Sequence, residues 1–167
     1  MLDWALEQDK HPVYIAIPSG PVVHAEGPVR TNFDDLNTYE VTRQGSKVAV
    51  LALGDFYDLG EKTVEALSST LGIEATLVKP YFASGVDQNL LDNLVKDHDV
   101  IVTIEDGIIE GGWGQNIASY LGTSSARVLN YGVKKAFYDR VNVAELMRES
   151  HLDPEFIAAD VKQALGL

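Results

Sequence analysis

The residues with the clearest chemical potential follow a single apolar segment. Residues 100–104 are all β-branched, as in a buried strand, and two adjacent acids, Glu105 and Asp106, come directly after them. A short loop then leads to a glycine-rich cluster and a helical segment that begins near Gln115. The cluster consists of Gly111, Gly112, Trp113 and Gly114. A strand, a glycine turn and a helix in this order are typical of places where α/β proteins bind anions or make contacts between subunits.

The details of this segment argue against catalysis. Neighbouring residues of a strand point to opposite sides, so Glu105 and Asp106 cannot act as an acid–base pair on one substrate. We expect each of them to cap backbone amides or to form a salt bridge. The glycine cluster does not fit the dinucleotide-binding fingerprint, because Ile117 stands where the third glycine would be. We therefore assign no catalytic residue and interpret the cluster as a packing turn, in a helix–sheet or domain–domain contact.

The remaining polar residues do not indicate a metal site. The chain has no cysteine, and its four histidines, which are His11, His24, His98 and His151, lack the spacing of a metal clamp. Neither a phosphate-loop lysine nor a Gly-x-Ser-x-Gly elbow is present. His98 lies between a predicted helix and a predicted strand, where we expect it to cap the helix end. Trp113 falls in a predicted loop, where an interface role and a core role are equally consistent with its type.

Composition limits the classes of partner. Among 167 residues, 25 are acidic and 13 are Lys or Arg, so the formal net charge is −12. Such a surface repels phosphate backbones and anionic membranes, and we expect no nucleic-acid or membrane partner. The N-terminal residues lack the pattern of a signal peptide, and no apolar stretch reaches the about 18 residues that indicate a membrane span. We predict a soluble, cytoplasmic protein.

Alternating strand and helix patterns predict a three-layer α/β/α fold. Its five-stranded sheet is mostly parallel and has one antiparallel edge strand. The predicted strands are 39–43, 47–53, 74–78, 99–104 and 127–131, and the predicted helices are 56–71, one from Asp87, one from Gln115, 142–149 and 154–165. A short glycine-centred turn at residues 44–46 predicts that the first two strands form an antiparallel hairpin. We expect Asp55 and Asp153 to begin helices and Gly72 to end one.

The first part of the chain is predicted to belong to a different domain from the rest. A short helix at Leu2–Gln8 and an apolar strand at Val13–Ile17 indicate the terminal helix and strand of a preceding domain, residues 1–22. Residues 23–38 are rich in turn formers and predict a linker, although a long surface loop within one domain is an alternative. Residues 39–167 then form the main α/β domain.

Several of these segments resemble one family. Val102–Asp106 followed by Gly111–Gly114, together with Leu77–Pro80 and Val128–Gly132, is similar to the C-terminal domain of transketolase-like, thiamine-diphosphate-dependent enzymes. The likeness is greatest to the 1-deoxy-D-xylulose-5-phosphate synthase family and covers nearly the whole chain. Residues 2–20 resemble the end of that family's middle, pyrimidine-binding domain.

The resemblance implies a piece of a larger homodimeric transferase. The parent would condense pyruvate with glyceraldehyde 3-phosphate in isoprenoid-precursor synthesis. Thiamine diphosphate and magnesium would bind in its other domains, so that this chain alone would bind no cofactor and turn over no substrate. Its partners would be those remaining domains, and its own role would be assembly. Glu105 and the Gly111–Gly114 turn would lie at packing surfaces.

One departure from the family pattern keeps other functions open. Pro18, Ser19 and Gly20 are a remnant of the family's substrate-phosphate loop, Arg-Tyr-Pro-Arg-Gly. Ala16 and Ser19 stand in place of its two arginines, and neither can bind a phosphate as arginine does. The first alternative is the C-terminal domain of another superfamily member, a transketolase or a 2-oxo-acid dehydrogenase beta subunit, with a different acceptor. The second is a stand-alone module that binds a small ligand or a protein.

Overall fold

The computed structural model describes residues 1–18 and 29–167 of the chain. Contacts divide it into two compact units, Met1–Leu36 and Asn37–Leu167. None of the helices in the described ranges has the length and hydrophobicity that a membrane span requires. That residues 1–22 end a preceding domain and that 23–38 link it to the next stays a prediction.

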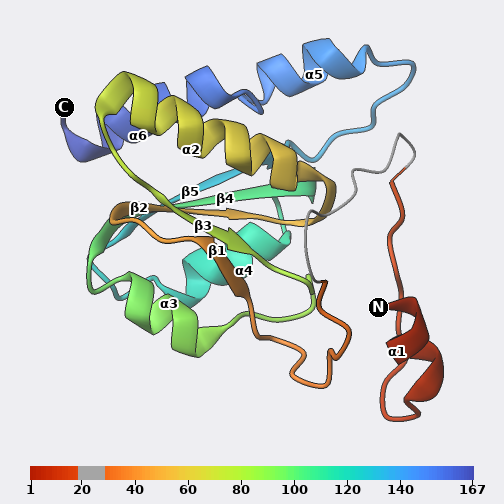
Figure 1. The fold of residues 1–167 in the computed structure, drawn as a ribbon. Helices are drawn as coiled ribbons and strands as arrows, with labels where there is room; N and C mark the ends of the chain where they lie inside the picture. Colours follow the sequence, from red (N-terminus) through yellow and green to blue (C-terminus); the bar gives the residue numbers. More distant parts are fainter. Residues whose placement is uncertain (19–28) are drawn as a thin grey trace. The chain divides into compact units, whose positions relative to one another are not determined.

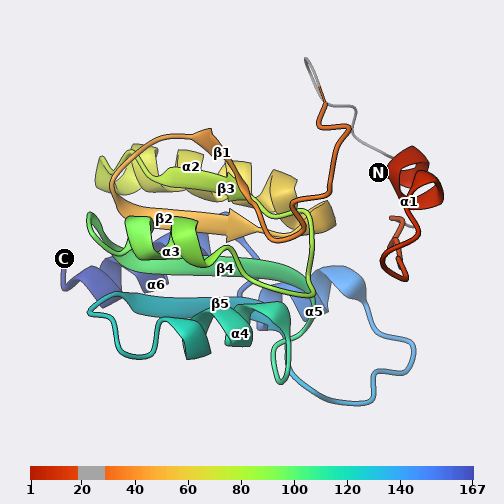
Figure 2. The same cartoon turned by 90° about the horizontal axis from the view of Figure 1, so that it is seen from below.

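The larger unit is a five-stranded sheet between two layers of helices (Figure 1). The strand order is β1-β3-β2-β4-β5, in which β1 is antiparallel to β3 and the other neighbours are parallel. The strands are β1 (Glu40–Arg43), β2 (Lys47–Ala52), β3 (Thr76–Lys79), β4 (His98–Ile108) and β5 (Arg127–Val133). Helices α2 (Tyr57–Leu71), α5 (Val143–Glu149) and α6 (Pro154–Leu165) lie on one side of the sheet, and α3 (Gln88–Leu94) and α4 (Trp113–Tyr120) lie on the other (Figures 1 and 2). The predicted three-layer fold is confirmed.

Strand β2 shows why the sheet must be covered on both faces. Val48 and Val50 belong to the core beneath α2 and α6, whereas Ala49 and Leu51 belong to the core beneath α3 and α4. All four are completely buried. Successive residues of a strand face opposite ways, so a run of apolar residues without polar alternation needs an apolar layer on each side.

The predicted hairpin is wrong. Strand β1 pairs with β3, in the register Glu40 opposite Lys79, and β3 lies between β1 and β2. The intervening turn crosses the amino end of β3 at very close range, because the Gly45 amide donates to Thr76 Oγ1 at 3.0 Å. A Cβ atom on Gly45 would lie 2.1 Å from the Glu74 carbonyl oxygen. Glycine at this position permits the crossing, and a short turn between two strands is therefore no proof that they pair.

Two of the three predicted helix caps are confirmed, and one is wrong. Gly72 ends α2 in the left-handed conformation at φ 65°, and Asp153 accepts the amides of Glu155 and Phe156 at the start of α6, as predicted. Asp55 does not cap α2. It lies inside a 3₁₀ turn, Gly54–Phe56, that precedes the helix, and no side chain caps α2.

In the smaller unit, the helix α1 (Leu2–Glu7) packs through Trp4. The Trp4 ring meets Phe33 edge-on at 5.9 Å between centroids, and its Nε1 donates to Asp34 Oδ1 at 2.8 Å. The predicted strand at residues 13–17 is wrong, because these residues have no strand structure, and Tyr14 and Ile17 are exposed. A strand needs a hydrogen-bonded neighbour, and the described residues supply none for this segment.

Asp87 provides a test of how the domain is held together. Its Oδ1 accepts the Leu90 amide at the start of α3, and its Oδ2 accepts the Tyr39 amide just before β1, both at 2.9 Å. Because Asp87→Ala removes a helix cap and leaves a second amide without an acceptor, we expect it to lower the free energy of unfolding by about 1–3 kcal/mol. Urea denaturation followed by circular dichroism measures this. Asp99 is exposed and is in no ion pair with the residues that the structure describes, so Asp99→Ala should change this free energy by less than about 0.5 kcal/mol.

Candidate functional site

The carboxyl ends of β2 and β4 mark the place where a sheet of this type can bind a ligand. The two strands are neighbours, and the helices that follow them, α2 and α4, cover opposite faces of the sheet (Figure 1). Open α/β sheets bind their ligands outside such a switch point. Glu105 and Asp106 lie here, in the last part of β4, which extends farther than predicted.

Glu105 fills this position with the protein's own carboxylate. Its Oε2 accepts the Trp113 amide at 2.8 Å, and its Oε1 accepts the Gly114 amide at 2.9 Å. These are the first amides of α4, which have no partner within the helix and which favour a negative charge. The side chain is 6% exposed. Glu105 thus caps backbone amides as expected, and it occupies the place that an anionic ligand would take.

The glycines bring α4 into contact with the sheet. A Cβ atom on Gly112 would lie 2.6 Å from Glu105 Oε1, and one on Gly114 would lie 2.4 Å from Thr103 Oγ1. Thr103 in turn donates to Asn130 Oδ1 at 2.8 Å, which joins β4 to β5 beneath the helix. Side chains at Gly112 and Gly114 would therefore push α4 off the sheet. The turn makes a helix–sheet contact inside this unit.

Not all of the predicted turn residues belong to this contact. Asp106 points away from Glu105 and is exposed, in keeping with its place one residue farther along the strand. Gly111 is also exposed and adopts φ 80°, which is the conformation that requires glycine. Of the substrate-loop remnant, Pro18 is half-buried, while Ser19 and Gly20 lie outside the described residues. An interface role for these residues stays a prediction.

Trp113 is a core residue of α4 and does not lie in a loop. It is 3% exposed, and its Nε1 donates to Tyr39 Oη at 2.9 Å. The Tyr39 hydroxyl donates to the Gly85 carbonyl at 2.9 Å, and burial raises the pKa of Tyr39 to about 12. This link between the start of β1 and α4 was missed in the sequence, because a single tyrosine before a strand carries no distinguishing pattern.

His98 closes the opposite, amino end of the sheet. Its Nδ1 lies 2.8 Å from the Leu94 carbonyl at the end of α3, and its Nε2 lies 2.7 Å from Thr76 Oγ1. The predicted cap at the helix end is confirmed. Nδ1 also lies 2.7 Å from Asp97 Oδ1, so both of its partners are acceptors and Nδ1 carries the proton. The ring joins α3 to β3.

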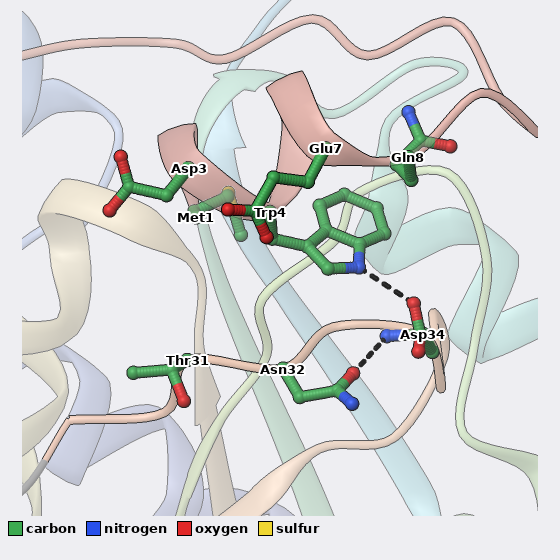
Figure 3. A pocket seen from close by; sticks show the side chains of 8 residues that line it. All are labelled: Met1, Asp3, Trp4, Glu7, Gln8, Thr31, Asn32 and Asp34. Carbon is green, nitrogen blue, oxygen red and sulfur yellow. Dashed lines mark hydrogen bonds between the residues drawn. The ribbon is translucent and has the colours of Figure 1, made fainter.

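The smaller unit contains an open pocket of about 420 Å³ (Figure 3). It is lined by Met1, Asp3, Trp4, Glu7, Gln8, Thr31, Asn32 and Asp34. Asp34 Oδ1 accepts from the Trp4 indole, which lowers the pKa of Asp34, and Asn32 Oδ1 accepts the Asp34 amide at 2.8 Å. These polar groups are therefore hydrogen-bonded to one another. Across the described ranges, no three histidine or acidic side chains are grouped so as to hold a metal ion.

The capping role of Glu105 can be measured. Because Glu105→Ala leaves two buried amides without an acceptor, we expect the free energy of unfolding to fall by about 2–5 kcal/mol. Glu105→Gln keeps one acceptor oxygen, so its loss should be smaller. Asp106→Ala is the matched change at the exposed neighbour and should be almost neutral. Equal losses for Glu105→Ala and Asp106→Ala in urea denaturation would contradict this assignment.

The buried Tyr39 predicts a loss of stability at alkaline pH. An unfolded tyrosine releases its proton near pH 10, whereas folded Tyr39 keeps it up to about pH 12. The contribution of Tyr39 to the free energy of unfolding is therefore complete below pH 10. It is lost as the pH rises through 12, at up to about 1.4 kcal/mol per pH unit. Tyr39→Phe should be less stable at neutral pH by about 1–2 kcal/mol, because two hydrogen bonds are lost, and should show a shallower alkaline decline.

Urea denaturation at a series of pH values tests this, with Tyr14→Phe at an exposed tyrosine as the matched control. Tyr131, whose pKa is raised by burial and by Asp160, should preserve part of the decline in every variant. If the free energy of unfolding falls with pH equally steeply in Tyr39→Phe and in the parent chain, Tyr39 is not the group that causes the alkaline loss of stability.

Comparison with known proteins agrees with this architecture. Residues 37–157 match the family model of the transketolase C-terminal domain. The 1-deoxy-D-xylulose-5-phosphate synthase of Pseudoalteromonas translucida is 33% identical over 153 residues, which are 90% of this chain and 24% of that protein. The Clostridium tetani synthase is 28% identical over 167 residues, 99% of this chain and 26% of that protein. The chain thus spans about a quarter of the length of these relatives.

Solved structures show the same fold. A split-gene transketolase, described as an inactive beta4 tetramer, superposes with a TM-score of 0.69 at 25% identity, over 78% of this chain and 43% of that one. A transketolase of Pichia stipitis superposes with a TM-score of 0.54 at 16% identity, over 77% of this chain and 18% of that one, which shows the fold alone. The strand order, the helix layers and the match over residues 37–157 lead to one conclusion: this chain belongs to the transketolase C-terminal domain family.

Proposed function

We propose that the chain is the C-terminal assembly domain of a 1-deoxy-D-xylulose-5-phosphate synthase-like enzyme. The parent would be a homodimer that condenses pyruvate with glyceraldehyde 3-phosphate. Thiamine diphosphate and magnesium would bind to portions other than this chain. The observation that carries the proposal is the similarity to synthases over 90% or more of the chain, combined with its span of only about a quarter of their length.

The geometry of the sheet supports an assembly role. At the switch point, where an enzyme of this fold class would hold a ligand, Glu105 already occupies the free amides of α4. A bound diphosphate would have to displace a buried carboxylate and would meet its negative charge. The split-gene transketolase supports the same view, since that protein is described as inactive in its tetrameric form.

A second candidate is a transketolase-type enzyme with a different acceptor. Ala16 and Ser19 stand in place of the arginines that the synthase family uses for the substrate phosphate, and Ala16 is exposed. A methyl group and a hydroxyl group at these positions cannot replace two guanidinium groups on a phosphate. A non-phosphorylated acceptor fits these residues better.

The cofactor part of the proposal predicts a negative binding result. Titration of thiamine diphosphate with magnesium into this chain should give no heat beyond dilution, because the residues that would hold both groups belong to other domains. The Pseudoalteromonas translucida synthase serves as the positive control. Saturable binding to this chain in the micromolar range would refute the proposal that it lacks a cofactor site.

A domain exchange tests the assembly role. The matching region of the Pseudoalteromonas translucida synthase is replaced by residues 37–167 of this chain, and formation of deoxyxylulose phosphate is measured. We expect the hybrid to remain dimeric and active, whereas the same synthase without any C-terminal domain should be inactive. Glu105→Ala in the hybrid should reduce the yield of folded dimer, and Asp106→Ala should not. A hybrid no better than the truncated enzyme would refute the assembly role.

A further inference from the structure

The carboxyl end of β4 carries two residues that are prone to one covalent reaction. Asp106 is followed by Gly107, and the sequence holds no other Asp–Gly and no Asn–Gly pair. In such a pair the carboxyl carbon of the aspartate lies close to the next amide nitrogen, and glycine has no Cβ atom to hinder their approach. We call these two residues the Asp–Gly pair. It is the place where this chain most readily closes a succinimide ring.

The Asp–Gly pair lies in a bulge of β4. Ile104 of β4 lies opposite Tyr131 of β5. Four residues farther along, Ile108 lies opposite Val133, so that β5 has advanced by only two. The extra residues of β4 form the bulge, and neither member of the Asp–Gly pair has a register partner in the described strands. Backbone outside the ladder rotates more freely than paired backbone, and closing the ring requires such a rotation.

Both reacting groups are accessible. Asp106 is exposed, and its carboxylate forms no hydrogen bond or ion pair with the residues that the structure describes. Apart from its chain neighbours, a Cβ atom on Gly107 would have no described atom nearer than Glu105 Oε2, at 3.9 Å. The space beside the attacking nitrogen is therefore open.

We propose that Asp106 is a site of covalent modification, at which the aspartyl residue converts to isoaspartyl through a succinimide. The Gly107 amide nitrogen attacks Asp106 Cγ and forms a C–N bond, and the carboxyl hydroxyl and the amide proton leave as water. Water then adds to one of the two ring carbonyls. Opening at Cγ restores aspartate. Opening at the main-chain carbonyl leaves the backbone running through Cβ and Cγ and frees the former main-chain carboxyl. Water is the only other reactant.

The conversion acts on the contact that holds α4. It lengthens the backbone by one methylene group directly after Glu105, whose carboxylate accepts the first amides of α4. On the other side, the Gly107 carbonyl oxygen would lie 2.9 Å from a Cβ atom on Gly132, so β5 leaves little room for a longer chain. An added backbone atom has to displace Glu105 or separate β4 from β5. We therefore expect the modified chain to be less stable than the unmodified one.

Incubation of the folded chain at neutral pH and physiological temperature, followed by peptide mapping, tests the proposal. Trypsin releases residues 97–127 as one peptide, in which Asp97 and Asp99 serve as internal controls for Asp106. Electron-transfer fragmentation distinguishes isoaspartyl from aspartyl, and we expect isoaspartyl to accumulate at Asp106. Incubation in heavy-oxygen water should add heavy oxygen at the same residue, because hydrolysis opens the ring. An isoaspartyl methyltransferase with labelled S-adenosylmethionine should methylate the incubated chain and not the fresh one.

Two variants separate the chemistry from the fold. Gly107 has no positive φ and has open space at its Cβ position, so Gly107→Ala should keep the circular dichroism spectrum of the parent chain. The added methyl group hinders the amide nitrogen, and isoaspartyl at Asp106 should fall severalfold. Asp106→Glu keeps the negative charge but would have to close a larger, less favourable ring. After incubation, urea denaturation should show a loss of stability in the parent chain and none in Asp106→Glu.

Three outcomes would overturn the proposal. The first is an incubated chain with no more isoaspartyl at Asp106 than at Asp97 or Asp99. The second is a Gly107→Ala variant that forms isoaspartyl as fast as the parent chain. The third, an incubated parent chain as stable as incubated Asp106→Glu, would refute the effect on α4. None of them affects the domain exchange, which tests the proposed function without reference to this reaction.

Discussion

The contact between the Glu105 carboxylate and the first amides of α4 sets the arrangement at the carboxyl edge of the sheet. It joins β4 to α4, and through Trp113 and Tyr39 it reaches the start of β1. A buried carboxylate is stable only if its charge is matched, and two amides at a helix start supply that match. Glu105 also leaves no room for a side chain at Gly112, and Thr103 leaves none at Gly114. The buried carboxylate thus restricts the residue type at Gly112 and holds the start of α4 against the sheet.

This arrangement also supports the assembly role proposed for the chain. The switch point between β2 and β4 exists in the topology, but its anion-binding groups are already used inside the chain. The loop between β5 and α5, residues 134–142, projects beside that edge of the sheet (Figure 2). The same edge of such a fold can bind a ligand or a partner, and the position of Glu105 supports the proposed assembly role.

The sequence predicted the regular elements well and their connections less well. Helix limits at Gly72 and Asp153 could be read because a left-handed cap and an N-terminal cap have strong residue preferences. The pairing of β1 could not be predicted from the sequence. It depends on how closely Gly45 passes the backbone at the start of β3, which is a long-range contact. The same holds for the site. Glu105 was found at its strand end and was expected to cap backbone amides, and its partners lie only a few residues along the chain. Tyr39 was missed, because it reaches Trp113 from a distant part of the chain.

The position of β3 between β1 and β2 has a consequence for the order of folding. Residues 40–43 are made before β2, α2 and β3, yet their hydrogen-bonding neighbour is completed only at Lys79. During synthesis, β1 therefore stays unpaired until β2, α2 and β3 have formed and the edge of β3 is available for pairing. Its burial pattern, with every residue exposed, suits a strand that docks late, because little apolar surface is left open to aggregation in the meantime.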